Sequence, residues 1–149
     1  MKYTDYLKSP MFWLRRVHLA TRKAMDEELE RFGLTAPQFE ILKQLWMQDG
    51  LEQRVLQDRM NITSATLTGI IDGLVEREQV ERRLSPDDAR VKQLFLTERG
   101  RAMQNELGAA VDRVQMRLLQ GFSASESALL QDWLKRMAVN LGCGHDDCH

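Results

Sequence analysis

Short hydroxyl side chains near the middle of this sequence suit contacts with the base edges of a DNA duplex. Ser64, Thr66 and Thr68 follow the turn residues Asn61-Ile62, and the small residues Ala65 and Gly69 lie next to them in the sequence. A helix that enters the major groove needs small polar groups at its N-terminal end, because bulky side chains hold the backbone away from the bases. Glycines inside a helix cost about 1 kcal/mol each relative to alanine. Gly69 and Gly73, both expected on the solvent side, therefore indicate a surface kept smooth for close approach.

Four basic residues lie a short distance beyond, on both sides of a polar turn. They are Arg82, Arg83, Arg90 and Lys92. Cations around a projecting turn can reach a phosphate backbone or a minor groove. Asp87 and Asp88 lie beside Arg90 and are expected to orient its guanidinium, which suits a narrow, electronegative minor groove. The competing interpretation is an ordinary solvated surface, and only the proximity of the two clusters favours DNA.

Composition requires any such surface to be local. The chain has 149 residues, a formal net charge of −1 and 29% charged residues, so it is not basic as a whole. Glu76, Glu78 and Glu81 are expected at the far end of the hydroxyl-bearing helix, away from the DNA-facing end. An apolar content of 43% is enough for a core without metals or disulfides. No run of about 20 apolar residues and no leader-like start occurs, so we expect a soluble, cytoplasmic protein without a membrane partner.

The elements that must position these residues follow from periodicity and capping. Apolar spacing of three and four predicts helices over 11–32, from Pro37 to about Trp46, over 51–60, from Thr63 to about Glu78, from Thr97 to Gly121, and from Ser123 to Leu141. Thr35 to Gln38 and Ser123 to Glu126 read as capping boxes. Alternation on either side of 85–90 predicts a two-stranded hairpin with a polar tip.

This order predicts a mainly α (α+β) fold, a winged helix-turn-helix with long N- and C-terminal dimerisation helices. We expect one domain over 1–149, with a DNA-binding lobe at 35–97, dimerisation helices at 11–32 and 98–141, and a tail at 142–149. The outer helices carry more large apolar side chains than a core of this size needs, namely Trp13, Leu130, Trp133, Leu134 and Met137. As a set they favour an interface between two copies.

The stretches 61–76, 81–90 and 96–100 resemble the MarR family of transcription regulators. The resemblance covers about Trp13 to Leu141 and implies a homodimer on pseudo-palindromic double-stranded DNA, with repression as the usual outcome. It implies that Arg90 enters the minor groove and that Ser64, Thr66 and Thr68 approach bases. Gly69 and Gly73 depart from the pattern, because many members carry basic side chains there. We therefore expect this protein to make fewer side-chain contacts to the bases, and phosphate contacts to contribute more of its affinity for DNA.

Two further groups of residues suggest ways of regulation. No cofactor is required, but the resemblance implies a small anionic aromatic effector, whose carboxylate could meet Arg15, Arg16 and His18 on the first helix. The tail contains potential metal ligands at Cys143, His145, Cys148 and His149. Their spacing is not a standard zinc pattern, and terminal tails are usually disordered, so metal or redox sensing is the less favoured interpretation.

An enzyme is not expected. Two of the three histidines lie in the tail, and neither a phosphate-binding glycine loop nor a nucleophile motif is present. The stronger alternative is a winged helix that binds another protein, because this fold alone does not fix its partner. Salt dependence separates the two, since only DNA binding releases condensed counterions.

Overall fold

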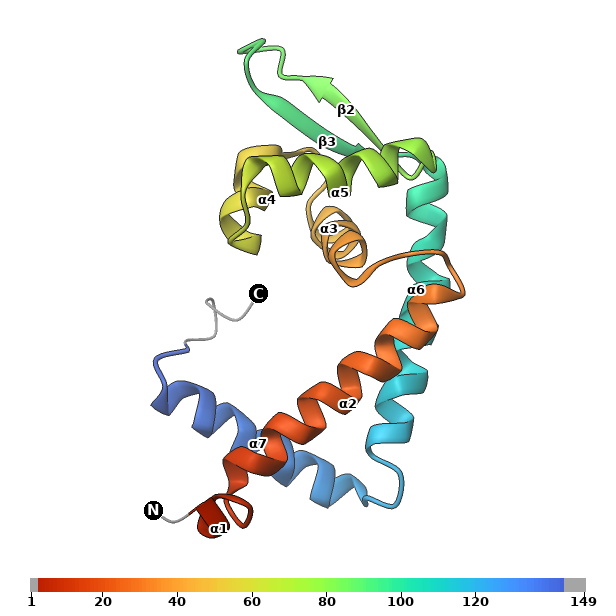
Figure 1. Ribbon diagram of the computed structural model, residues 1–149. Coiled ribbons are helices and arrows are strands. Elements are labelled where there is room, and N and C mark those ends of the chain that lie inside the picture. The colour runs from red at the N-terminus through yellow and green to blue at the C-terminus, as the bar shows by residue number, and fades with distance from the viewer. Residues whose placement is uncertain (1–2, 144–149) are drawn as a thin grey trace. The chain divides into compact units, whose positions relative to one another are not determined.

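The computed structural model describes residues 3–143, which form helices and one small antiparallel sheet (Figure 1). The elements are α1 (Tyr3–Tyr6), α2 (Pro10–Glu30), α3 (Ala36–Met47), β1 (Leu51–Glu52), α4 (Gln53–Met60), α5 (Ser64–Glu76), β2 (Val80–Leu84), β3 (Lys92–Leu96), α6 (Glu98–Leu118) and α7 (Ala124–Asn140). This confirms the predicted mainly α, winged helix-turn-helix fold. The chain divides into two compact units, Met1–Val114 and Gln115–His149. The first unit contains the whole helix-turn-helix and the hairpin.

Side-chain caps begin the helices where the sequence predicted them. The Thr35 hydroxyl accepts from the Gln38 amide at 3.4 Å, and the Gln38 side chain accepts from the Thr35 amide at 3.1 Å. Ser123 and Glu126 form the same reciprocal pair at the start of α7. Thr97 accepts from the Gly100 amide at 3.1 Å at the start of α6. Both predicted capping boxes are confirmed.

The sheet has three strands in the order β1-β3-β2. Leu51 of β1 lies opposite Leu94 of β3, and Leu94 also lies opposite Arg82 of β2. The prediction of a helix over the whole of 51–60 was therefore wrong at its start. Leu51 is only 4% exposed and completes the sheet, and the helix begins at Gln53. A strand of two residues is too short for alternation to show in the sequence.

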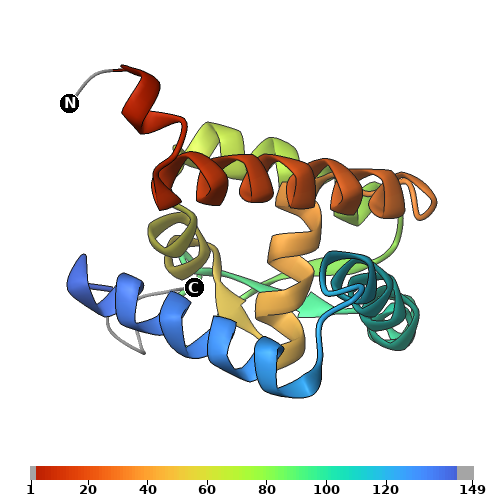
Figure 2. The same ribbon diagram turned by 90° about the horizontal axis from the view of Figure 1, so that it is seen from below.

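The core of the first unit lies between α3, α5 and the sheet. Helix α5 buries Leu67, Ile71 and Leu74 and leaves Ile70 and Val75 half-buried, as its apolar spacing predicted. Figure 2 shows α3 running across α2, which adds the buried Leu29 to the same core. The sheet contributes Leu94, which is fully buried. This core fixes α5 and the hairpin against each other.

The outer helices carry large apolar side chains that their own units leave exposed. Helix α7 has no buried residue, and Trp133, Leu134 and Met137 are all exposed. In the first unit, Trp13 of α2 is 59% exposed. Leu130 is half-buried. None of the helices formed by residues 3–143 combines the length and apolarity needed to span a bilayer.

Candidate nucleic-acid interface

The exposed face of α5 consists of small and hydroxyl residues, as predicted. The turn from α4 passes through Asn61, which has a φ of 50° in the left-handed region that asparagine tolerates. Thr63 then caps α5 by accepting from the Thr66 amide at 3.2 Å. The predicted DNA-facing residues of this helix are all exposed: Ser64, Ala65, Thr66, Thr68 and Gly69. The Thr68 hydroxyl donates to the Ser64 carbonyl at 2.9 Å, and the Thr66 hydroxyl lies 2.9 Å from that of Thr63, so these two groups must rotate before they can donate to a ligand. The positive end of the helix dipole favours a negatively charged ligand at this end of α5.

The two glycines of α5 differ in what surrounds them. A Cβ added at Gly69 would meet no atom within 4 Å, which agrees with the predicted open surface. A Cβ added at Gly73 would lie 2.5 Å from the Gln38 Nε2. Gly73 is half-buried, so the expectation that it lies on an open surface is met only in part, and the missing side chain gives room to a nearly buried glutamine of α3. Only Gly69 belongs to the smooth face.

The hairpin tip projects from the protein, and its turn is held by backbone contacts. The Ser85 amide donates to the Val91 carbonyl at 2.8 Å, and the residues from Pro86 to Arg90 are exposed. The Asp88 carboxylate accepts from the Arg90 backbone amide at 2.9 Å. The prediction that this carboxylate orients the Arg90 guanidinium was therefore wrong. Asp88 shapes the turn, and the Arg90 guanidinium forms no ion pair with any residue between 3 and 143.

Two of the predicted DNA-binding arginines are engaged within the protein. Arg82 of β2 donates to the Asp72 carboxylate at 2.5 Å and to the Thr68 carbonyl at 3.3 Å, so it ties the hairpin to α5. Arg83 pairs with Glu81 and lies over the Phe95 ring, with its guanidinium carbon 4.4 Å from the ring centroid. Their contact with DNA stays a prediction.

A groove of about 580 Å³ opens between α4, α5 and the hairpin. Its lining brings Ser64 and Thr68 of the helix together with Arg90 and Lys92 of the hairpin. In Figure 1 the N-terminal end of α5 and the hairpin tip lie on the same side of this unit. The two clusters that the sequence indicated separately thus form one surface. Sequence reasoning missed the third wall, Gln53 and Arg54 of α4, because nothing in a short helix shows which face meets the groove.

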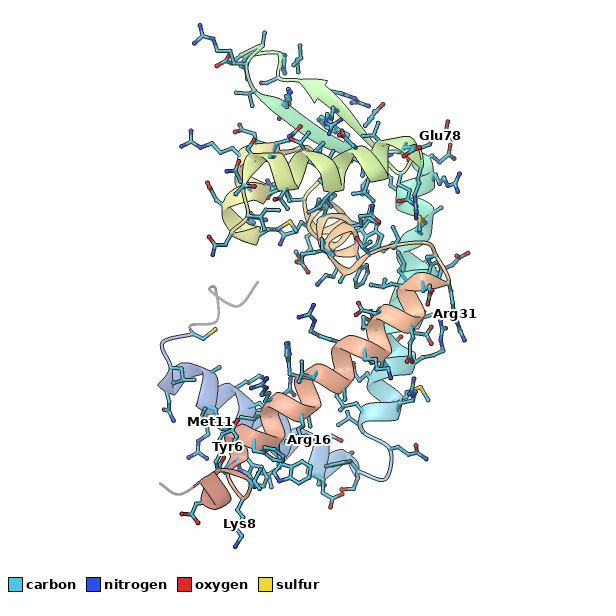
Figure 3. The ribbon with its side chains drawn as sticks, viewed as in Figure 1. Tyr6, Lys8, Met11, Arg16, Arg31 and Glu78 are labelled. Atoms are coloured by element: carbon cyan, nitrogen blue, oxygen red, sulfur yellow. The ribbon has the colours of Figure 1, made fainter. Side chains whose placement is uncertain are left out.

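Carboxylates at the other end of α5 lie away from this surface. Glu76 ends the helix, and Glu78 follows it in the turn to β2, at the far end from Ser64 (Figure 3). The predicted separation of charge along α5 is confirmed for these two residues, and Glu81 pairs with its neighbour Arg83 in β2. The groove itself is lined by three cations and two carboxylates, Glu52 and Asp58, so its excess of positive charge is three minus two, or one.

An ion pair in the first unit joins α2 to α6. Arg113 donates from Nε and Nη2 to one oxygen of Glu28, at 3.1 and 2.6 Å. The hydrogen bond that Arg113 donates to Glu28 raises the pKa of Arg113 above its ordinary value, and burial opposes this effect. Arg113 is thus a structural residue and not a freely solvated cation.

The candidate effector residues belong to α2, and the candidate metal ligands belong to the last seven residues of the sequence. Arg15, Arg16 and His18 are exposed on α2, and the Arg16 guanidinium carbon is 5.6 Å from the Phe12 ring centroid (Figure 3). Of the tail ligands, Cys143 is disulfide-bonded, and His145, Cys148 and His149 lie outside the described residues. Within residues 3–143, no cluster of three His, Cys, Asp or Glu side chains is placed to hold a metal ion.

Comparison with known proteins gives consistent matches. A family model described as "MarR family" matches residues 34–92, from just before α3 to the first residue of β3. The uncharacterized HTH-type transcriptional regulator YdgJ of Bacillus subtilis is 33% identical over 109 residues, which are 73% of this chain and 66% of YdgJ. The chain thus spans just under two thirds of that relative.

A second relative is matched over nearly its whole length. This HTH-type transcriptional repressor of Mycobacterium tuberculosis is 29% identical over 131 residues, 88% of this chain and 91% of its own. Among solved structures, a mutant Escherichia coli MarR complexed with operator DNA has a TM-score of 0.75 at 23% identity, covering 92% of this chain and 99% of that one. That likeness shows the fold.

Proposed function

This chain belongs to the MarR family of winged helix transcriptional regulators, and we propose on that premise that two copies of it bind the two half-sites of an operator. The observation that supports this most is the single surface on which the hydroxyl end of α5 meets Arg90 and Lys92. Helix α5 enters the major groove, and the hairpin reaches the adjacent minor groove with Arg90. Repression is the outcome we propose, in the cytoplasm and without a catalytic step.

The proposed dimer uses the exposed apolar residues of the outer helices. Trp13 of α2 and Trp133, Leu134 and Met137 of α7 leave more apolar surface uncovered than a lone chain of this size usually tolerates. A second copy covers this surface and holds two α5 helices near the 34 Å repeat of DNA. Sedimentation should give a particle of twice 17.3 kDa at micromolar concentration, and a 17.3 kDa particle would contradict the dimer.

Regulation by a small anionic aromatic compound is part of the proposal. Arg15, Arg16 and His18 are its candidate ligands, because they are exposed cationic or titratable groups on α2. A change in the spacing of the two α5 helices by even a few ångströms would release DNA. No cofactor is needed for the DNA-binding step.

The test is a fluorescence-anisotropy titration on duplexes that tile the DNA upstream of the coding sequence. Affinity should fall steeply with salt, and Arg90→Ala should lose about tenfold or more. Arg22→Ala is the matched control, because Arg22 is exposed on α2 and does not line the groove. Arg113 is unsuitable as a control, since it holds Glu28. Equal losses for the two variants would refute the role of Arg90, and a flat salt response would favour a protein partner.

A further inference from the structure

Three cationic side chains line the groove between α4, α5 and the hairpin and are not engaged in the described ion pairs. Arg54, Arg90 and Lys92 are exposed, and none of them forms an ion pair with another residue of the described range 3–143. Other arginines of the same unit are engaged: Arg59 donates to Gln44 at 2.6 Å, and Arg101 pairs with Asp49 at 2.8 Å. The groove thus brings together three cations that the described ion pairs do not use, from α4 and from the hairpin.

The position of the groove determines which part of a duplex can occupy it. If α5 lies in the major groove and the hairpin tip in the next minor groove, one sugar-phosphate strand must cross between them. The space between α5 and the hairpin is this groove, since Ser64 and Thr68 form one wall and Arg90 and Lys92 form another. Its volume is about 580 Å³, and the exposed side chains along it are accessible from solvent.

We propose that this groove seats the sugar-phosphate strand between the major and minor grooves, and that Arg54 of α4 is a phosphate-binding residue. The inference deepens the proposed function and rests on it. Arg54 supplies a charge from α4 in addition to those of the hairpin, so that a phosphate in the groove meets cations from two elements. Half-buried Gln53 and Gln57 on the same helix add amide donors.

Two carboxylates in the same groove oppose this binding. Glu52 and Asp58 are exposed, line the groove and form no ion pair with any residue between 3 and 143. Asp58 is one helical turn from Arg54 on α4, yet the two side chains do not pair. Both carboxylates lie within a Debye length of a strand seated there and repel it. We infer that they limit the affinity of the protein for DNA of any sequence.

The test measures binding to a random-sequence duplex, because phosphate contacts do not depend on sequence. Arg54→Gln should weaken binding about tenfold in 50 mM salt, and each lost contact makes the slope of log affinity against log salt shallower by about 0.9. A dimer has two grooves, so the slope should change by about 1.8. Arg22→Gln, a charge-matched change on α2, should leave both quantities unchanged.

Charge removal on the opposing residues should act in the other direction. Glu52→Gln and Asp58→Asn should each raise affinity by about threefold in 50 mM salt, and by less in 200 mM salt. Glu27→Gln is the control, because Glu27 is an exposed carboxylate of α2. Far-UV circular dichroism of every variant should match that of the unaltered protein.

The outcomes separate this inference from the proposed function. If the unaltered protein binds DNA with a steep salt dependence but Arg54→Gln behaves like Arg22→Gln, the groove assignment fails and the regulator assignment stands. If the protein binds no duplex at any salt concentration, both fail. If Glu52→Gln and Asp58→Asn change affinity no more than Glu27→Gln, the limiting role of the carboxylates is refuted.

Discussion

Alanine substitution at the two glycines of α5 should affect stability in different ways, although both lie in the same helix. Gly69→Ala should raise the free energy of unfolding by about 1 kcal/mol, the propensity difference inside a helix. The added Cβ meets no atom within 4 Å, so nothing offsets that gain. Gly73→Ala has the same propensity gain, but its Cβ would lie 2.5 Å from the Gln38 Nε2 and must displace that amide.

The cost of displacing the Gln38 amide determines the difference in unfolding free energy between Gly69→Ala and Gly73→Ala. Gln38 is only 9% exposed, and its side chain accepts from the Thr35 amide at 3.1 Å in the capping box of α3. Losing that hydrogen bond costs about 0.5–1.5 kcal/mol. Gly73→Ala should therefore be close to neutral, about 1 kcal/mol less stable than Gly69→Ala.

Urea denaturation followed by circular dichroism measures both variants. The protein concentration must be held constant, because the stability of a dimer depends on it. Adding Gln38→Ala to both glycine variants completes the test, since removal of the long side chain should restore the full gain at Gly73. Equal stabilisation by Gly69→Ala and Gly73→Ala in the presence of Gln38 would refute the reasoning.

Three further expectations follow from charged contacts. A double-mutant cycle with Arg82→Ala and Asp72→Ala should give a coupling of about 0.2–1 kcal/mol in unfolding free energy, because the pair is partly exposed. Zero coupling would mean that this ion pair does not stabilise the packing of the hairpin on α5. Arg113→Gln should lower the Tm, because the nearly buried Glu28 carboxylate then lacks the charge of Arg113. Adding Glu28→Gln to the same chain should restore part of the lost Tm. An unchanged Tm for Arg113→Gln would contradict this role. The Ser123 amide lowers the pKa of Glu126 below its ordinary value of 4.5, so its contribution to stability is present above that value and is lost as pH falls through the lowered pKa. Unfolding free energy measured between about pH 6 and pH 3 should fall less steeply for Glu126→Gln than for the unaltered chain, and parallel curves would show that the cap does not titrate.

Sequence reasoning succeeded where the determining interactions are local. A cap joins residues three positions apart, as Thr35 and Gln38 do, and the apolar stripe of α5 repeats within one helix. The hairpin depends on alternation and on turn residues such as Pro86. These signals predicted the element order and the exposed hydroxyl face of α5, while the resemblance to the MarR family came from the stretches 61–76, 81–90 and 96–100.

The partners of individual side chains required the tertiary structure. Leu51 becomes a strand residue only because Leu94 lies beside it, 43 positions later in the chain. A Cβ at Gly73 would meet a glutamine of another helix, and Arg82 pairs with Asp72 of α5. Arg54 joins the groove because α4 packs beside the hairpin. A linear sequence records which residues are charged or small, but the packing of separate elements decides which of them meet each other and which face the groove.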